Sequence, residues 1–146
     1  MKFTCQVDIE QPLEKVIELF DNVDNLKEWQ DGFVSFEHLS GTPGEPGARS
    51  RMLYKTGKRE MELIETIAIK NLPEEFSGVY EHKHMINTMT NRFKAIDANS
   101  THYEVEIEYT ELRHFMVKLM AFFVPGMFQK QVQKWLDQFK AFAERS

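Results

Sequence analysis

The apolar positions near the end of the chain repeat with the period of an α-helix. Phe128, Val132, Trp135, Phe139 and Phe142 follow one another at intervals of four, three, four and three residues, which predicts a helix from about residue 125 to residue 145. Glutamines and lysines occupy its other faces. Four of the five stripe residues are aromatic, so we expect this helix of about six turns to cover a broad apolar surface.

The start of the chain predicts a strand followed by two short helices. Polar and apolar residues alternate over Phe3–Ile9, as in a strand with one buried face. Pro12 suits the first turn of a helix, and the apolar residues of Leu13–Phe20 then recur at helical spacing. We expect a second short helix over Asp24–Trp29 and a second strand over Phe33–Leu39.

From residue 48 to residue 110 the alternation continues as an antiparallel meander. Turns are predicted at residues 56–57, 71–73, 86–87 and 97–100. With these turns the outer face carries five pairs of opposite charge across neighbouring strands, and the inner face is largely apolar. The predicted pairs are Arg51 with Glu62, Glu62 with Lys83, Glu81 with Arg92, Arg92 with Glu106, and Lys94 with Glu104.

Composition and charge narrow the functional classes. The 146 residues suit a single domain over 1–146, and the formal net charge of −5 argues against a nucleic-acid surface, which needs a basic field. Cys5 is the sole cysteine, so an intramolecular disulfide and a cysteine-based metal cluster are excluded. Because the sequence shows no signal-peptide pattern, we expect the protein to be cytoplasmic. We expect a monomer or a homodimer.

The segment at residues 115–124 is strongly apolar but too short to span a bilayer, so no stable membrane insertion is expected. Its apolar residues surround the predicted helix instead of forming one stripe. We expect it to be buried against the short helices. The alternatives are an interfacial membrane or partner contact, or a gate over a cavity.

The order and spacing of these elements resemble the START/Bet v 1-like (SRPBCC) superfamily, and within it the polyketide cyclase/dehydrase-like group. The resemblance covers essentially the whole chain. The motifs that carry it are Pro12-Leu13-Glu14-Lys15-Val16, Asp24–Trp29, Gly44-x-x-Gly47-x-x-Ser50, Glu65-Thr66, Leu72-Pro73 and Phe139-Lys140-x-Phe142.

The resemblance implies an α+β helix-grip fold. In this fold a curved seven-stranded antiparallel sheet wraps around a long C-terminal helix, and two short helices lie between the first and second strands. The resemblance also implies a cavity between sheet and helix that holds lipids, sterols, polyketides or plant hormones. No cofactor is implied.

We therefore predict that the protein binds a small, largely apolar molecule. The polar end of the ligand would be oriented by inward-facing polar side chains, namely Glu65, His82, Asn91, Tyr103 and Tyr109. Affinity would come from apolar side chains, namely Met61, Leu63, Phe93, Val105, Ile107, Met127, Phe128 and Trp135.

Two other functions remain open. With the turns predicted above, Glu65 lies within one register step of His82, and His82 lies opposite Asn91. A Glu65–His82 pair in an apolar cavity could act as acid and base in a cyclase or dehydratase. Alternatively, Glu65 and His82 could hydrogen-bond to each other or to buried water and serve only to order the core. A protein-interaction module without a substantial cavity is the third possibility.

A metal site is not predicted. His82 and His84 with Glu65 could supply three ligands, but the spacing lacks the tight constellation of a metal motif.

Overall fold

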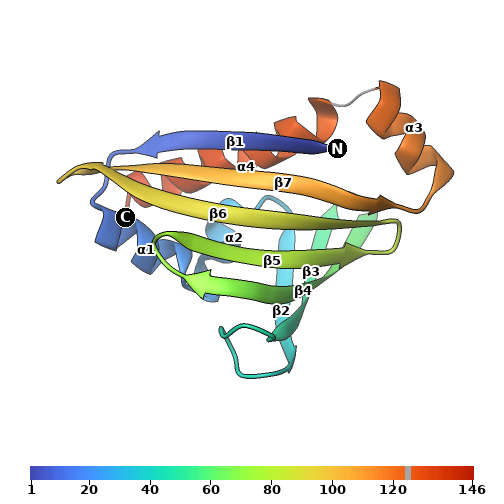
Figure 1. Cartoon of the computed structure of the whole chain (residues 1–146), viewed down its shortest axis with the longest axis horizontal. Helices are drawn as coiled ribbons and strands as arrows, with labels where there is room; N and C mark the ends of the chain where they lie inside the picture. Colours follow the sequence, from blue (N-terminus) through green and yellow to red (C-terminus); the bar gives the residue numbers. More distant parts are fainter. Residues whose placement is uncertain (124–125) are drawn as a thin grey trace.

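A curved antiparallel sheet of seven strands forms the body of the molecule (Figure 1). The structure is a computed structural model and describes residues 1–123 and 126–146. The strand order across the sheet is β1-β7-β6-β5-β4-β3-β2. The strands are β1 (Lys2–Ile9), β2 (Phe33–Ser40), β3 (Arg49–Thr56), β4 (Arg59–Asn71), β5 (Glu75–His82), β6 (Met85–Asp97) and β7 (Ser100–Leu112).

The described helices lie where the sequence predicts them, except that the helix expected over Asp24–Trp29 is divided into a 3-10 turn and a shorter α-helix. Helix α1 (Leu13–Phe20) follows β1, and the long helix α4 (Gly126–Glu144) lies across one face of the sheet (Figure 1). Between α1 and β2 the chain forms a 3-10 turn, η1 (Val23–Asn25), that leads into α2 (Leu26–Trp29). The helix-grip architecture is confirmed.

Helix α4 is held beside β1, at the edge of the sheet. The side-chain amide of Gln129 donates to the carbonyl of Thr4 at 3.3 Å, and that of Gln133 donates to the carbonyl of Gln6 at 3.1 Å. Carbonyls two residues apart on a strand and side chains four residues apart on a helix both advance by about 6–7 Å, so the two series stay in step. These bonds also satisfy edge carbonyls that would otherwise be open to pairing with another chain.

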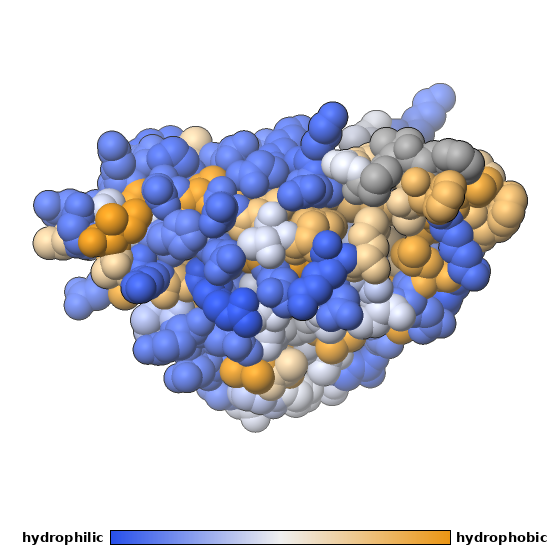
Figure 2. All heavy atoms as spheres, turned by 45° about the horizontal axis from the view of Figure 1, so that its top comes forward, coloured by the Kyte–Doolittle hydropathy of each residue, from blue (hydrophilic) through white to orange (hydrophobic). Residues whose placement is uncertain are grey.

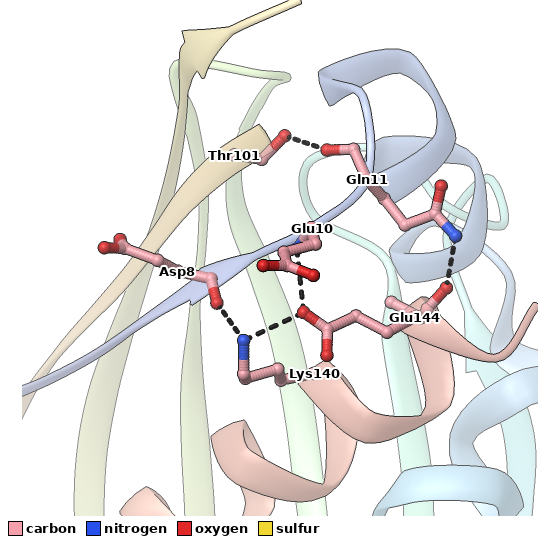
Figure 3. A network of polar contacts seen from close by, with 7 residues as sticks. Asp8, Glu10, Gln11, Thr101, Lys140 and Glu144 are labelled. Carbon is pink, nitrogen blue, oxygen red and sulfur yellow. Dashed lines mark hydrogen bonds and ion pairs between the residues drawn. The ribbon is translucent and has the colours of Figure 1, made fainter. Parts of the chain in front are cut away.

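A polar network fixes the C-terminal end of α4 to the connection between β1 and α1 (Figure 3). Lys140 donates to the backbone carbonyl of Asp8 and contacts the Glu144 carboxylate at 2.8 Å. The same carboxylate accepts the backbone N–H of Glu10 at 2.8 Å, and the Gln11 side chain donates to a carbonyl at the end of α4 at 3.0 Å. The helix is therefore anchored along β1 and at its C-terminus.

The aromatic core sits under the C-terminal half of α4. Phe139 is fully buried and its ring packs against Trp29 at 5.1 Å and Tyr103 at 5.7 Å between centroids. Phe20 at the end of α1 contacts Phe93 at 4.8 Å, and Phe93 stacks on Tyr103 at 4.4 Å. The short helices α1 and α2 therefore fill this end of the fold with rings.

The strand pairing differs from the predicted register at three hairpins. Strands β5 and β6 turn at residues 83–84, so His82 pairs with Met85 and Asn91 pairs with Phe76. The prediction that His82 lies opposite Asn91 is wrong by six residues. The prediction of Arg51 opposite Glu62 is wrong by two, although the diagonal still allows their ion pair at 3.0 Å. Among the other predicted pairs, Glu81 lies opposite Ile86, Arg92 opposite Glu104 and Lys94 opposite His102.

Helix α3 (Phe115–Phe123) is exposed, whereas the sequence led us to expect burial against the short helices. It lies at the end of the molecule opposite α1 (Figure 1), and Phe115 and Met116 are 70% and 54% exposed. Apolar side chains gather on this end of the surface (Figure 2). Residues 124 and 125, with the predicted break before α4, lie outside the described residues. No described helix is long and apolar enough to cross a membrane.

Candidate functional site

A cavity of about 590 Å³ lies between α4 and the inner face of the sheet. Its wall is built from strands β2 to β7, the α1–α2 segment and the N-terminal half of α4. No described residue of β1 lines it, because β1 is where α4 rests directly on the sheet. The volume falls within the range of about 300–1,000 Å³ that is typical of ligand sites.

Most of the predicted ligand-binding residues line this cavity. The apolar ones on its wall are Met61, Leu63, Ile107, Phe128 and Trp135, and the polar ones are Glu65, His82, Asn91, Tyr103 and Tyr109. Alternation therefore predicted the inward face of β4, β5, β6 and β7 at these positions. Whether these residues bind a ligand stays a prediction.

Three predicted residues do not line the cavity. Phe93 lies between Phe20 and Tyr103 within the aromatic core. Val105 is fully buried and pairs with Cys5, whose thiol contacts a backbone carbonyl of α4 at 3.6 Å, so the helix covers this part of the sheet. Met127 is not on the wall, because its neighbour Phe128 takes that direction and successive helical residues point about 100° apart.

Three hydrogen-bonded pairs of polar side chains lie in the cavity wall. Tyr80 donates its hydroxyl to Glu65 Oε2 at 2.7 Å, and Tyr103 donates to Asn91 Oδ1 at 2.7 Å. Tyr54 donates to Gln30 Oε1 at 2.6 Å. Sequence analysis did not select Tyr54, Tyr80 or Gln30 as site residues. Alternation placed both tyrosines on the inner face, whereas Gln30 follows α2 and carries no periodic signal.

Burial determines the protonation of these groups. Desolvation raises the pKa of the Glu65 carboxyl, and the hydrogen bond from Tyr80 opposes this shift in part. Burial also raises the pKa of Tyr109 to about 12 and moves the pKa values of the other cavity tyrosines upward. Neutral tyrosine hydroxyls are therefore the hydrogen-bond donors at neutral pH.

Gly78 leaves the space that Tyr80 needs to reach Glu65. A methyl group at Gly78 would lie 3.3 Å from a ring carbon of Tyr80 and 3.4 Å from its hydroxyl oxygen. It would also lie 3.1 Å from the backbone carbonyl of Thr66 on β4. The absence of a side chain at Gly78 thus lets the tyrosine ring lie close to the sheet, with its hydroxyl directed to β4.

Glu65 and His82 lie one register step apart, as predicted, but no hydrogen bond joins their side chains. Among the described residues Glu65 has a hydrogen bond only from Tyr80, its partner across the strands. His82 lies beside the β5–β6 turn, where its Nδ1 accepts the backbone N–H of His84 at 3.2 Å. Burial, followed by the nearby His84 and Lys83, lowers the pKa of His82. Within residues 1–123 and 126–146, no three acidic, histidine or cysteine side chains form a metal site.

Comparison with solved structures gives close matches in fold at low sequence identity. The structure of the ZhuI aromatase/cyclase from Streptomyces sp. R1128 matches with a TM-score of 0.80 and 12% identity, covering 99% of this chain and 94% of that one. Ara h 8.0201 matches with a TM-score of 0.75 and 11% identity, over 100% of this chain and 99% of that one. TTHA0849 from Thermus thermophilus matches with a TM-score of 0.78 and 16% identity, over 98% and 97%.

The chain has the START/Bet v 1-like helix-grip fold. No protein-family model matches its sequence, and neither does the sequence of any curated protein. The START/Bet v 1-like fold is therefore recognised here from element order and three-dimensional structure at identities of 11–16%. At such identities it is the fold that is shared, and the function must be argued from the cavity.

Proposed function

We propose that the protein binds a small, largely apolar molecule in the cavity between the sheet and α4. The observation that carries this proposal is the cavity itself, which has a volume of about 590 Å³ beside a closely packed aromatic core. Protein interiors contain few voids larger than a water molecule, because unfilled space loses dispersion contacts. A ligand with apolar surface would recover those contacts along Met61, Leu63 and Ile107.

The interaction-module hypothesis is less well supported. It assumed that no substantial cavity exists, and the cavity here is about twice the size of about 300 Å³ at which drug-sized ligands begin to fit. The exposed α3 remains an apolar surface in its own right, but it does not account for the space inside the sheet.

Titration with a neutral apolar fluorophore tests the proposal. N-phenyl-1-naphthylamine should show saturable binding, and Met89→Trp, which fills the cavity from β6, should weaken its affinity about tenfold, or about 1.4 kcal/mol. The control is Ile96→Trp, on the exposed end of the same strand, which should leave affinity unchanged. Absence of binding, or equal effects of the two variants, would contradict the proposal. If Met89→Trp does not fold, Leu63→Phe provides a smaller change at the same wall.

Native mass spectrometry of freshly purified protein provides a second test. A co-purifying small molecule of uniform mass would identify the ligand directly. It should be lost or reduced in Met89→Trp and kept in Ile96→Trp. A ligand retained equally by both variants would place binding outside the cavity.

A cyclase- or dehydratase-type activity is the second candidate function. It is favoured by the aromatase/cyclase ZhuI among the similar structures and by Glu65, a buried carboxyl with a raised pKa on the cavity wall. Such a group keeps its proton to a higher pH than an exposed carboxyl and can serve as a general acid. Tyr80, whose hydroxyl donates to Glu65, is the partner that would share the proton.

Incubation with a short poly-β-ketone thioester, followed by mass spectrometry, tests this activity. Cyclisation with loss of water in wild type but not in Glu65→Gln, with fluorophore binding unchanged, would support an enzyme. The same product yield in both proteins would exclude Glu65 as the acid or base.

A further inference from the structure

A row of polar side chains crosses the cavity wall at a single level of the sheet. Each member is the direct cross-strand partner of the next, from β2 to β7, and each lines the cavity. Neighbouring strands lie about 4.8 Å apart, so the row presents one polar group at about that interval. We call it the polar row; its members are His38, Ser50, Glu65, Tyr80, Asn87 and Tyr109.

The levels beside the polar row are largely apolar. Two residues away along the strands on one side, Phe36, Met52 and Leu63 pair across β2, β3 and β4. On the other side the paired residues across β4 to β7 are Ile67, Gly78, Met89 and Ile107. A ligand that lies along the polar row therefore meets largely apolar surface on either side of it, and the Tyr103–Asn91 and Tyr54–Gln30 pairs elsewhere on the wall already bond to each other.

Hydrogen bonding within the protein uses only part of this row. Tyr80 donates to Glu65 Oε2, and His38 bonds the carbonyl of Gly41 at 2.8 Å. Glu65 Oε1, the Ser50 hydroxyl and the Asn87 amide form no hydrogen bond with another described residue, and the same holds for the Tyr109 hydroxyl. Ser50 and Glu65 are only 4% and 8% exposed. Buried polar groups normally have partners, so these are directed to a ligand or to water in the cavity.

The charge of the row selects among ligands. Among the described residues no lysine, arginine or histidine forms an ion pair with Glu65, and Lys70 on the cavity wall pairs with Asp21 at 3.4 Å. In its ionised form this carboxyl, with no cation beside it, accepts a donor group and repels an anion, and burial strengthens both effects. Ligands with a carboxylate head are therefore disfavoured at this level of the cavity.

We propose that the ligand is an apolar molecule with hydrogen-bond donors, such as hydroxyl groups, along one edge, which the polar row binds, and that carboxylate-headed ligands are rejected. This inference rests on the proposed function. It adds the chemistry of the polar edge: Glu65 accepts a donor, while Ser50, Asn87 and Tyr109 bind further oxygen or nitrogen atoms along the same edge.

Displacement of N-phenyl-1-naphthylamine by matched naphthalenes at about pH 7 tests the inference. 2-Naphthol, a neutral donor, should bind about tenfold more tightly than 2-methoxynaphthalene, because only the hydroxyl group can donate a hydrogen bond to Glu65. 2-Naphthoate should bind most weakly. 2,7-Dihydroxynaphthalene, with two donors on one edge, should bind more tightly than 2-naphthol.

Three variants separate the row from the cavity. Glu65→Gln keeps the acceptor for Tyr80 and removes the charge, so it should raise the affinity for 2-naphthoate. Glu62→Gln makes the same change on the outer face of β4, where Glu62 pairs with Arg51, and should change nothing. Asn87→Leu should remove the advantage of 2,7-dihydroxynaphthalene over 2-naphthol.

The proposed function and the inference about the polar row are contradicted by different results. If the fluorophore does not bind, the proposed function is wrong. If it binds but 2-methoxynaphthalene or 2-naphthoate displaces it as well as 2-naphthol does, the cavity binds ligands and the inference about the polar row is wrong. Equal affinities for one and two hydroxyl groups would overturn the role of the row beyond Glu65.

Discussion

The two halves of α4 meet the same sheet in different ways. At the C-terminal half, Phe139 is fully buried among Phe20, Trp29 and Tyr103. At the N-terminal half, Phe128, Val132 and Trp135 border a cavity of about 590 Å³. The stripe of apolar residues is continuous along the helix, so the helix sequence alone does not explain the difference.

The difference comes from what else fills the space beneath the helix. Helices α1 and α2 supply Phe20 and Trp29 under the C-terminal half only. The bonds of Gln129 and Gln133 to β1 hold the N-terminal half at the edge of the sheet, away from the middle strands. The closely packed core under the C-terminal half of α4 thus supports the cavity under its N-terminal half, and a binding site on a well-packed scaffold can hold its side chains in place.

Truncation of one phenylalanine at each end gives the largest expected effect. Phe139→Ala should lower the free energy of unfolding by about 3–5 kcal/mol, because a close-packed site cannot collapse around the lost ring. Phe128→Ala should cost clearly less, since its half-buried ring already borders the cavity. Urea unfolding of both variants measures the difference. Equal losses would mean that the two ends are packed alike.

The charge of Glu65 should make the stability of the protein dependent on pH. Because burial raises the pKa of Glu65 in the folded protein, the folded state binds its proton more readily than the unfolded state. Its contribution to stability is therefore complete below the unfolded pKa and is lost as pH rises through the folded pKa.

Glu65→Gln should then stabilise the protein by about 1–2 kcal/mol near pH 8, the scale expected for a buried carboxylate that accepts a hydrogen bond but has no cation beside it. The gain should shrink on acidification towards pH 4. Thermal unfolding at several pH values measures it, with Glu62→Gln on the opposite face as the control. A gain that does not vary with pH would show that the carboxylate is well solvated.

The glutamines that hold α4 to β1 should have a smaller effect. Gln129→Ala and Gln133→Ala should each lower the free energy of unfolding by about 0.5–1.5 kcal/mol, since each removes one hydrogen bond to an edge carbonyl. Amide hydrogen exchange in β1 should increase in both. Lys130→Ala, on an exposed position of the same helix, is the control. Unchanged exchange in β1 would argue that packing alone positions the helix.

The smallest effect is expected for a substitution in α3, which belongs to neither half of α4. Phe115 is 70% exposed, so Phe115→Ser should change the free energy of unfolding by less than about 0.5 kcal/mol. Fluorophore affinity should also stay the same if the helix does not gate the cavity. A large loss of stability would indicate that Phe115 is buried, as the sequence led us to expect.

Periodicity predicted more than pairing did, for a geometric reason. Three of the four predicted hairpins are shifted by two or six residues, and an even shift keeps each side chain on the same face of the sheet while changing its cross-strand neighbour. Glu65, Asn91 and Tyr109 therefore face inward as predicted. The β4–β5 register places Tyr80 opposite Glu65 and His82 one register step away, as predicted, whereas the β5–β6 turn pairs His82 with Met85 instead of Asn91.

Alternation and helical spacing were thus sufficient for the element order, the inner face of the sheet and the helix that covers it. They could not locate the cavity, because that depends on long-range contacts: Gln129 and Gln133 bonded to β1, and Phe20 and Trp29 packed under one end of α4. They also could not show that the polar residues of six strands lie at one level. Local pattern depends on the backbone period alone, whereas register and helix position depend on which distant atoms meet.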